Sequence, residues 1–105
     1  MIFELRQYQI QPGKREEWIR FMDEVIIPFQ LSKGMVILGS FAEVDTDQYI
    51  WIRRFDDEDD RTRLYDAVYQ SDHWRETISP QVGNLIDRSQ IKVTLMAATP
   101  HSFIQ

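Results

Sequence analysis

The sequence predicts an α+β chain of the ferredoxin-like class, in which the order β-α-β-β-α-β builds an antiparallel sheet with both helices on one face. Two observations support this class. Four short segments have the composition and alternation of strands, namely 2–10, 35–44, 48–55 and 91–98. The longer segments between the first and second strands, and between the third and fourth, carry apolar residues at helical spacing. With 105 residues and 43% hydrophobic content, we expect a single domain over residues 1–105.

The first strand and the first helix occupy the N-terminal part of the chain. Residues 2–10 carry bulky side chains on both faces, which is typical of a central strand covered on both sides. Pro12 and Gly13 end this strand, and a helix is expected from about Lys14 to Phe29. Its apolar stripe consists of Trp18, Phe21, Met22, Val25 and Phe29. Pro28 is expected to close the helix, because proline has no backbone N–H to donate.

A β-hairpin follows the first helix. Residues 35–44 are rich in apolar and β-branched side chains, which favour a strand. The short polar run Asp45-Thr46-Asp47 is typical of a turn, and residues 48–55 form the returning strand. The second and third strands are therefore expected to pair directly.

The second helical region begins with acidic residues. Asp56 and Asp57 are candidate N-caps for a helix that runs to about Gln70. A second short helical piece is expected up to Ile78, and Pro80 is expected to interrupt it. One further turn over 82–87 and a fourth strand over 91–98 complete the expected order.

Charged and aromatic side chains gather on one face of the expected sheet. Alternate residues of a strand point to opposite faces, so Glu4, Arg6 and Tyr8 share one face of the first strand. By the same rule Trp51 and Arg53 share a face of the third strand, and Tyr65 and Tyr69 of the second helix lie one turn apart above the sheet. The candidate ligand-binding residues are Glu4, Arg6, Tyr8, Trp51, Arg53 and Tyr69.

Two interpretations of this cluster are open. In the first, the arginines recognise a small anionic or aromatic ligand in a pocket between the sheet and the helices. In the second, Glu4 bridges Arg6 and Arg53 in a structural ion-pair network. One acid against two bases leaves a formal charge of about +1. That charge calls for an anionic ligand, or for a carboxylate from elsewhere, such as Asp56 or Asp66.

The opposite face of the sheet is expected to be apolar. It would carry Phe3 and Leu5 from the first strand and Ile50 and Ile52 from the third. A two-layer fold leaves this face uncovered, and so large an apolar patch calls for a partner. The simplest partner is a second copy of the chain, and we expect a homodimer that packs sheet face against sheet face.

Several classes of function are disfavoured by composition. The net charge of −5 disfavours nonspecific nucleic-acid binding, and no apolar run has the length of a membrane span. Cysteine is absent, and the two histidines, His73 and His101, are too far apart in sequence for a metal motif. The acidic run 56–60 lacks the ligand spacing of a calcium loop. We therefore expect no cofactor, no metal, no nucleic-acid partner and no membrane partner, and a cytoplasmic location.

A family resemblance is carried by short segments in a fixed order. They are Glu4-Leu5-Arg6-Gln7-Tyr8, Pro12-Gly13-Lys14, Ile27-Pro28, Gly39-Ser40-Phe41, Trp51-Ile52-Arg53-Arg54-Phe55, Tyr69-Gln70-Ser71-Asp72-His73-Trp74 and Thr99-Pro100. In this order and spacing they resemble the NIPSNAP family, over about residues 2–102. The resemblance implies a dimeric α+β barrel, in which two ferredoxin-like sheets close on each other. It implies no catalytic residues, because the family has no generally agreed chemistry.

Three functions follow as alternatives. The leading hypothesis is a NIPSNAP-type domain that binds a small anionic or aromatic molecule between the sheet and the helices. The second is a cofactor-independent, monooxygenase-like enzyme acting on an aromatic substrate, a chemistry found among relatives with the wider barrel fold. The third is a noncatalytic interaction module, in which the cluster of charges is fully neutralised and encloses no void. Whether the chain is an enzyme is left open, and no catalytic residue is assigned.

Overall fold

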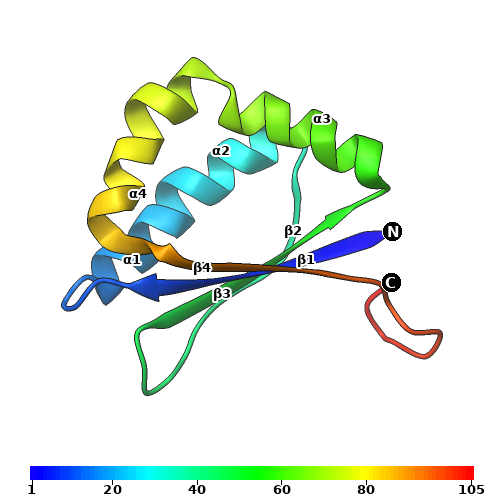
Figure 1. Cartoon of the computed structure of the whole chain (residues 1–105), viewed down its shortest axis with the longest axis horizontal. Coiled ribbons are helices and arrows are strands. Elements are labelled where there is room, and N and C mark those ends of the chain that lie inside the picture. The colour runs from blue at the N-terminus through cyan, green and yellow to red at the C-terminus, as the bar shows by residue number, and fades with distance from the viewer.

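The computed structural model describes all residues 1–105. Four strands form one antiparallel sheet, in the order β2-β3-β1-β4, and all helices lie on one side of it (Figure 1). The strands are β1 (Ile2–Ile10), β2 (Val36–Ala42), β3 (Gln48–Phe55) and β4 (Ile86–Met96). The predicted α+β, ferredoxin-like class and the predicted order of elements are confirmed.

The pairing of β1 with β3 sets the face on which each side chain lies. The register is unbroken from Ile2 to Gln9, and it pairs Glu4 with Arg53 and Arg6 with Trp51. Paired residues in an antiparallel sheet point to the same face, so these four side chains all point toward the helices. The two central strands thus bring the candidate residues together, as the alternation of the sequence predicts.

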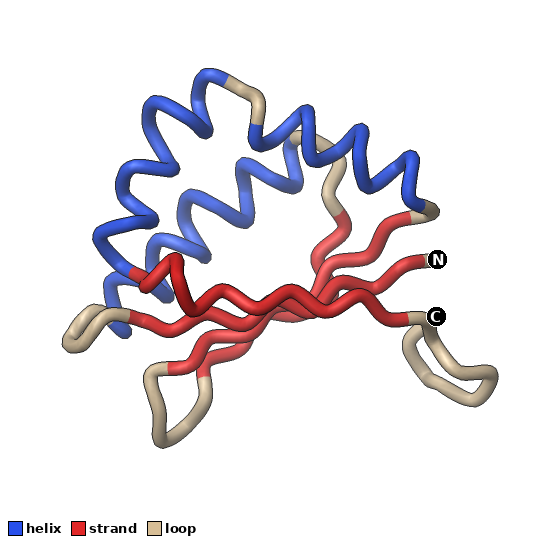
Figure 2. Tube along the Cα trace, viewed as in Figure 1, coloured by secondary structure: helices blue, strands red, loops and turns tan.

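Two helical arms cover the helix-facing side of the sheet, as Figure 2 shows. The first arm consists of α1 (Arg15–Phe21), the π-helical segment η1 (Met22–Ile26) and α2 (Ile27–Ser32). The second arm consists of α3 (Glu58–Tyr69), the π-helical segment η2 (His73–Ile78) and α4 (Ser79–Leu85). Asp57 caps α3 as predicted, because its carboxylate accepts a hydrogen bond from the backbone N–H of Asp60 at 2.8 Å.

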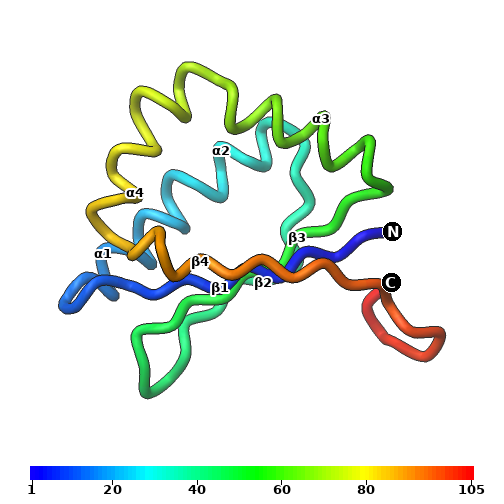
Figure 3. Tube along the Cα trace, in the orientation of Figure 1, coloured from blue at the N-terminus to red at the C-terminus, as the bar shows by residue number.

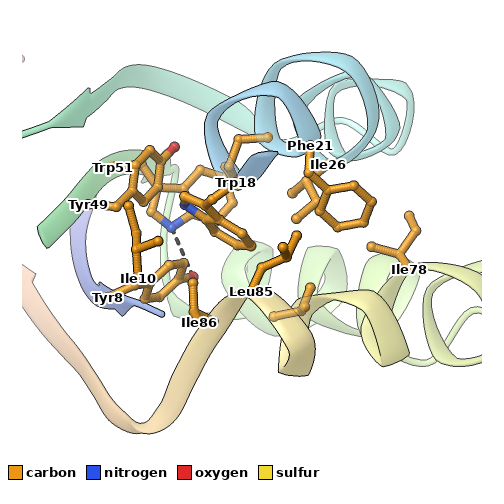
Figure 4. Packing of buried hydrophobic residues seen from close by; sticks show 12 residues of the cluster. Tyr8, Ile10, Trp18, Phe21, Ile26, Tyr49, Trp51, Ile78, Leu85 and Ile86 are labelled. Carbon is orange, nitrogen blue, oxygen red and sulfur yellow. Dashed lines mark hydrogen bonds between the residues drawn. The ribbon is translucent and has the colours of Figure 1, made fainter. Parts of the chain in front are cut away.

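The main hydrophobic core joins the first arm, α4 and the sheet (Figure 4). Aromatic rings dominate it: Trp18 lies edge-on to Tyr8 and to Tyr49, with ring centroids 5.8 and 5.7 Å apart. A smaller cluster under α3 contains Met35, Phe55, Leu64 and Val68. The two clusters hold the two ends of the second arm.

The expected ends of both helices at proline are wrong. The first arm continues past Pro28 to Ser32, and the second continues past Pro80 to Leu85. Each proline stands two residues after a π-helical segment, η1 or η2. A π-helical turn bonds each N–H to the fifth residue back, so the local hydrogen-bond pattern can pass a residue that has no N–H.

The last strand begins earlier than the expected range of 91–98. Ile86 and Asp87 already pair with Ile10 and Gln9 of β1, and after a shift of register Lys92 pairs with Gln7. The residues between the two paired stretches form an irregularity of the bulge type. The side chains in this region are polar, and for that reason the sequence predicts no strand before residue 91.

The sheet face away from the helices, called the outer face below, is less bare than expected at one end. The chain after β4 turns back there, as the red end of the trace in Figure 3 shows. Arg54 donates a hydrogen bond to the backbone carbonyl of Gln105 at 3.0 Å. Phe3 and Ile104 line one hollow of about 280 Å³, and Phe3 is only 5% exposed. The tail thus covers part of a face that was predicted to be open.

Candidate functional site

A cavity of about 370 Å³ lies between the sheet and the helical arms. This volume is within the usual range for small-molecule sites. Every helical segment except α2, and every strand except β2, contributes to its wall. The thirteen lining residues are Arg6, Tyr8, Trp18, Met22, Ile26, Trp51, Tyr65, Tyr69, Trp74, Val82, Ile86, Arg88 and Ile91. Two of them are arginines and none is acidic, so the wall favours a negatively charged or apolar occupant.

The six predicted ligand-binding residues separate into two groups. Four of them line the cavity: Arg6, Tyr8, Trp51 and Tyr69. The other two, Glu4 and Arg53, are fully buried and do not line it. Their contacts, described next, favour a structural role for these two.

All five N–H groups of the Arg53 guanidinium have partners inside the protein. Nε and Nη2 donate to Oε1 of Glu4 at 3.0 and 2.5 Å. Nη1 donates to Oε1 of Gln30 and to the hydroxyl of Tyr69, both at 2.8 Å, and Nη2 also donates to the hydroxyl of Tyr65 at 3.1 Å. Arg53 therefore has no donor left for a ligand.

Glu4 is surrounded by donors in the same way. Besides Arg53, its carboxylate accepts hydrogen bonds from the hydroxyl of Tyr65 and from Nε of Arg61 at 3.0 Å. Burial alone would raise the pKa of Glu4, but the charge of Arg53 and the hydrogen bonds from Tyr65 and Arg53 outweigh it, so the pKa lies below the ordinary value for glutamate. Glu4 is thus an ionised structural anion with no freedom to act as a base.

This lowered pKa predicts a loss of stability in acid. A carboxylate whose pKa is lower in the folded state stabilises the protein above its unfolded pKa, and the stabilisation is lost as the pH falls through the folded value. We expect the free energy of unfolding to fall steeply below about pH 4.3, the ordinary value for glutamate. A Glu4→Gln variant should be less stable at pH 7 and should show a shallower decline in urea titrations between pH 7 and 3. Equal slopes for the two proteins would contradict this account of Glu4.

Arg6 differs from Arg53, because part of its guanidinium is free. Its Nε donates to the hydroxyl of Tyr8 at 2.7 Å, and Nη1 donates to the hydroxyl of Tyr65 at 3.2 Å. Nη1 also lies 3.7 Å from Oε1 of Glu4, an ion-pair distance that is too long for a hydrogen bond. Nη2 has no protein partner, and the side chain is 15% exposed. Arg6 is thus the one predicted arginine with donors available to the cavity.

The hydroxyl of Tyr8 joins the two central strands. It accepts a hydrogen bond from Nε of Arg6 and another, at 3.0 Å, from the indole N–H of Trp51 (dashed line in Figure 4). Burial raises the pKa of Tyr8, so the phenol keeps its proton at neutral pH. Tyr8 is therefore a neutral hydroxyl in the wall of the cavity.

One buried side-chain polar atom has no hydrogen-bond partner, and it belongs to a residue of the cavity wall. The indole N–H of Trp18 is buried without an acceptor. Trp18 is 1% exposed and its ring lines the cavity. An unpaired buried donor costs free energy, and in native proteins such groups call for an explanation.

Sequence reasoning missed most of the cavity wall and part of the network. The helical spacing places Trp18 and Met22 in the core stripe of the first helix, and the pattern of the sequence assigns no role to Arg61 or Gln30. One signal was present for Arg61: it lies one helical turn before Tyr65, to which its Nη2 donates at 3.2 Å. No pattern in the sequence pointed to Gln30, whose burial depends on tertiary packing.

Both π-helical segments contribute to the cavity. Met22 and Ile26 come from η1, and Trp74 comes from η2. π-helical turns are rare and occur frequently at functional sites, because the extra residue redirects side chains. Their coincidence with the cavity supports this region as the functional site.

No group of three or more histidine, aspartate or glutamate side chains is placed to hold a metal ion. None of the helices combines the length and the apolar character that crossing a membrane requires.

Comparison with known proteins agrees on the family and on the fold. A family model described as NIPSNAP matches residues 3–102. A NIPSNAP family protein from Agrobacterium tumefaciens strain C58 has a similar structure, with a TM-score of 0.89, 23% identity, and 99% of this chain and 98% of that chain covered. A second NIPSNAP family protein from the same strain, of unknown function, has a TM-score of 0.90 and 20% identity, with 100% and 94% covered.

A more distant structural neighbour is described as an antibiotic biosynthesis monooxygenase. Its TM-score is 0.64 and its identity is 19%, with 95% of this chain and 100% of that chain covered. A comparison with curated protein sequences found no match. All three similar structures are less than 25% identical to this chain in sequence, so the similarity supports the fold alone.

Proposed function

The chain belongs to the NIPSNAP family, and we propose that it binds a small, largely apolar molecule with one anionic group in the cavity between the sheet and the helices. The main observation that supports this proposal is the position of Arg6. Its guanidinium lines a mostly apolar and aromatic cavity, in which Arg88 is the one other charged residue. It has an Nη2 without a protein partner and faces no acidic side chain in the wall. A cation placed in this way is an attractive site for an anionic group.

The rest of the wall supports an apolar body for the ligand. Around the cavity, Met22, Ile26, Val82, Ile86 and Ile91 present aliphatic surface. A site with a few placed polar groups and a mostly apolar wall is typical of small-molecule binding. The presence of the cavity also favours binding over a pure interaction module, for which we expected neutralised charges and no void.

An oxygenase-like activity is the second candidate. The site offers no free base: Glu4 is held by donors, and burial raises the pKa of Tyr65 to about 12. A reaction here would depend on a substrate that is itself acidic, with the positive charge of Arg6 stabilising the substrate anion. The likeness in fold to an antibiotic biosynthesis monooxygenase makes this candidate worth a separate assay, but carries no residue roles.

Ligand binding is tested with a model acid. We expect 1-naphthoate to raise the melting temperature of the wild-type protein and to bind measurably by calorimetry. Arg6→Met should weaken this binding about tenfold or more, because a charge-assisted hydrogen bond contributes about 1.5–3 kcal/mol. The fold should survive the change, because Glu4 keeps its hydrogen bonds from Arg53 and Arg61.

A matched control separates local contact from net charge. Arg63→Met makes the same chemical change on α3, at a side chain that is 70% exposed and outside the cavity. It should leave the affinity for 1-naphthoate unchanged. Equal losses in the Arg6 and Arg63 variants, or no binding to the wild type, would count against the proposed function.

We also propose that two copies of the chain associate through their outer faces. The outer face carries half-buried Leu5, Ile50 and Ile52, and Phe41 beside them is 57% exposed. Contiguous apolar surface of this kind is unusual on a monomer. A second copy would cover it, and residues on the helix-facing side would stay free for the ligand.

A further inference from the structure

We propose, building on the cavity-binding function above, that Tyr8 and Arg6 together bind one oxygen-bearing anionic group, and that the ligand is an apolar acid in its carboxylate or enolate form. The inference goes beyond the attraction of Arg6 for an anion, because it assigns the specificity for the group to a neutral hydroxyl. It rests on the direction of hydrogen bonding at each polar atom in the cavity wall.

The first step concerns the hydrogen atom of the Tyr8 hydroxyl. The oxygen already accepts from Nε of Arg6 at 2.7 Å and from the indole N–H of Trp51 at 3.0 Å. Its own hydrogen must point away from both donors. No protein acceptor takes this hydrogen, so it is available to an occupant of the cavity.

The second step concerns the neighbouring guanidinium. The bond from Nε of Arg6 to the Tyr8 hydroxyl fixes the two groups side by side, and Nη2 of Arg6 has no partner. Two free donors on adjacent groups suit the two oxygens of a carboxylate, or a single enolate oxygen. Because burial raises the pKa of Tyr8, its hydroxyl is a donor throughout the neutral range.

The third step is that the polar groups of the cavity wall that still lack a hydrogen-bond partner are all donors. The buried indole N–H of Trp18 has no acceptor, and its ring centroid lies 5.8 Å from that of Tyr8. The hydroxyl of Tyr69 accepts from Arg53 and from Gln30, so its hydrogen is also free. No acceptor is left over, since the hydroxyl of Tyr65 already donates to Glu4 and accepts from three arginines.

A wall that only donates selects its ligand by chemistry. An amine, alcohol or amide brings hydrogens that would be buried without an acceptor, and a buried donor without an acceptor weakens binding. A carboxylate or an enolate brings acceptors alone. The ligand class that fits both the donors and the aliphatic wall is therefore an alkyl or aryl acid with one ionised oxygen group.

The experiment compares 1-naphthoate with 1-naphthamide, which has nearly the same shape but no charge and two N–H donors. Wild-type protein should bind 1-naphthoate at least tenfold more tightly in calorimetry. Tyr8→Phe should weaken the binding of 1-naphthoate about tenfold and should reduce the preference over the amide. Tyr49→Phe is the matched control: its hydroxyl is buried in the same core and bonds to Ser40, but it does not line the cavity, so binding should be unchanged.

A second measurement does not depend on any variant being folded. In wild-type protein with carbon-13 at Cζ of its four tyrosines, 1-naphthoate should shift the Cζ resonance of Tyr8, and 1-naphthamide should shift it much less. The Cζ resonance of Tyr49 serves as the internal reference. This shift reports hydrogen bonding by the phenol directly.

The outcomes separate the two proposals. If 1-naphthoate binds the wild type but Tyr8→Phe binds it equally well and the Tyr8 resonance is unmoved, the assignment of Tyr8 is overturned while the proposed function stands. If the wild type binds neither compound, the result contradicts both the proposed function and this inference. Loss of binding in Tyr8→Phe with full binding in Tyr49→Phe supports the donor pair.

Discussion

Replacing Arg53 by methionine should lower the free energy of unfolding by about 3–5 kcal/mol, the typical effect of removing one partner from a buried ion pair. The change removes both hydrogen bonds that the buried carboxylate of Glu4 accepts from Arg53, and it leaves Oε1 of Gln30 without its donor. Aromatic rings surround the guanidinium: its Cζ lies 4.7 Å from the ring centroid of Trp51 and 5.2 Å from that of Tyr65. Methionine would still fill the space between these rings. Urea denaturation at pH 7 measures the loss.

Two controls make the result specific to the buried network. Arg54→Met removes the adjacent arginine, whose bond to the carbonyl of Gln105 is on the surface, and it should cost less than about 1 kcal/mol. The double variant Glu4→Gln with Arg53→Met should recover part of the loss, because the uncompensated charge is removed. If Arg53→Met kept its stability but no longer bound 1-naphthoate, Arg53 would belong to the binding site and the scaffold assignment would be wrong.

The contrast between the two arginines on the helix-facing side of the sheet shows what the sequence can and cannot predict. Alternation along β1 and β3 placed Arg6 and Arg53 correctly on the helix-facing side. In sequence the two look equivalent, since each lies two residues from an aromatic residue on a central strand. Only the tertiary positions of Gln30 and Tyr65 show that Arg53 is saturated and that Arg6 is not. Strand parity predicts which side chains share a face, and it says nothing about which of them have spare donors.

The two central strands were easier to predict than the helical arms for a related reason. The expected ranges 2–10 and 48–55 agree with β1 and β3, where alternation is strong and the ends are marked by turns or polar residues. The ends of the helical arms were missed because local rules treat proline as a stop, whereas Pro28 and Pro80 follow π-helical turns. A π-helical turn is stabilised by packing against the rest of the fold, and single-sequence patterns do not reveal it. The same two turns supply Met22, Ile26 and Trp74 to the cavity, so the unpredicted π-helical turns concealed part of its wall.

The proposed homodimer gives the second large effect. Phe41→Arg should raise the dissociation constant of the dimer by about three orders of magnitude, since an unpaired charge in an apolar interface costs roughly 4 kcal/mol. Phe41 pairs with Ile50 on the outer face and is 57% exposed in one chain, so the arginine can be solvated in the monomer. Sedimentation velocity at micromolar concentration should show wild type near twice the chain mass of 12.6 kDa and the variant near one.

Val44→Arg is the matched control for the dimer, because it adds the same charge at an apolar residue that is 90% exposed in the turn between β2 and β3. It should remain dimeric. A wild-type protein that sediments as a monomer at these concentrations would exclude the proposed interface, and a dimer unaffected by Phe41→Arg would place the contact elsewhere. Binding of 1-naphthoate should persist in the monomeric Phe41 variant, because Phe41 lies on the outer face and is not a residue of the cavity wall. Loss of both properties together would mean instead that the second copy shapes the cavity.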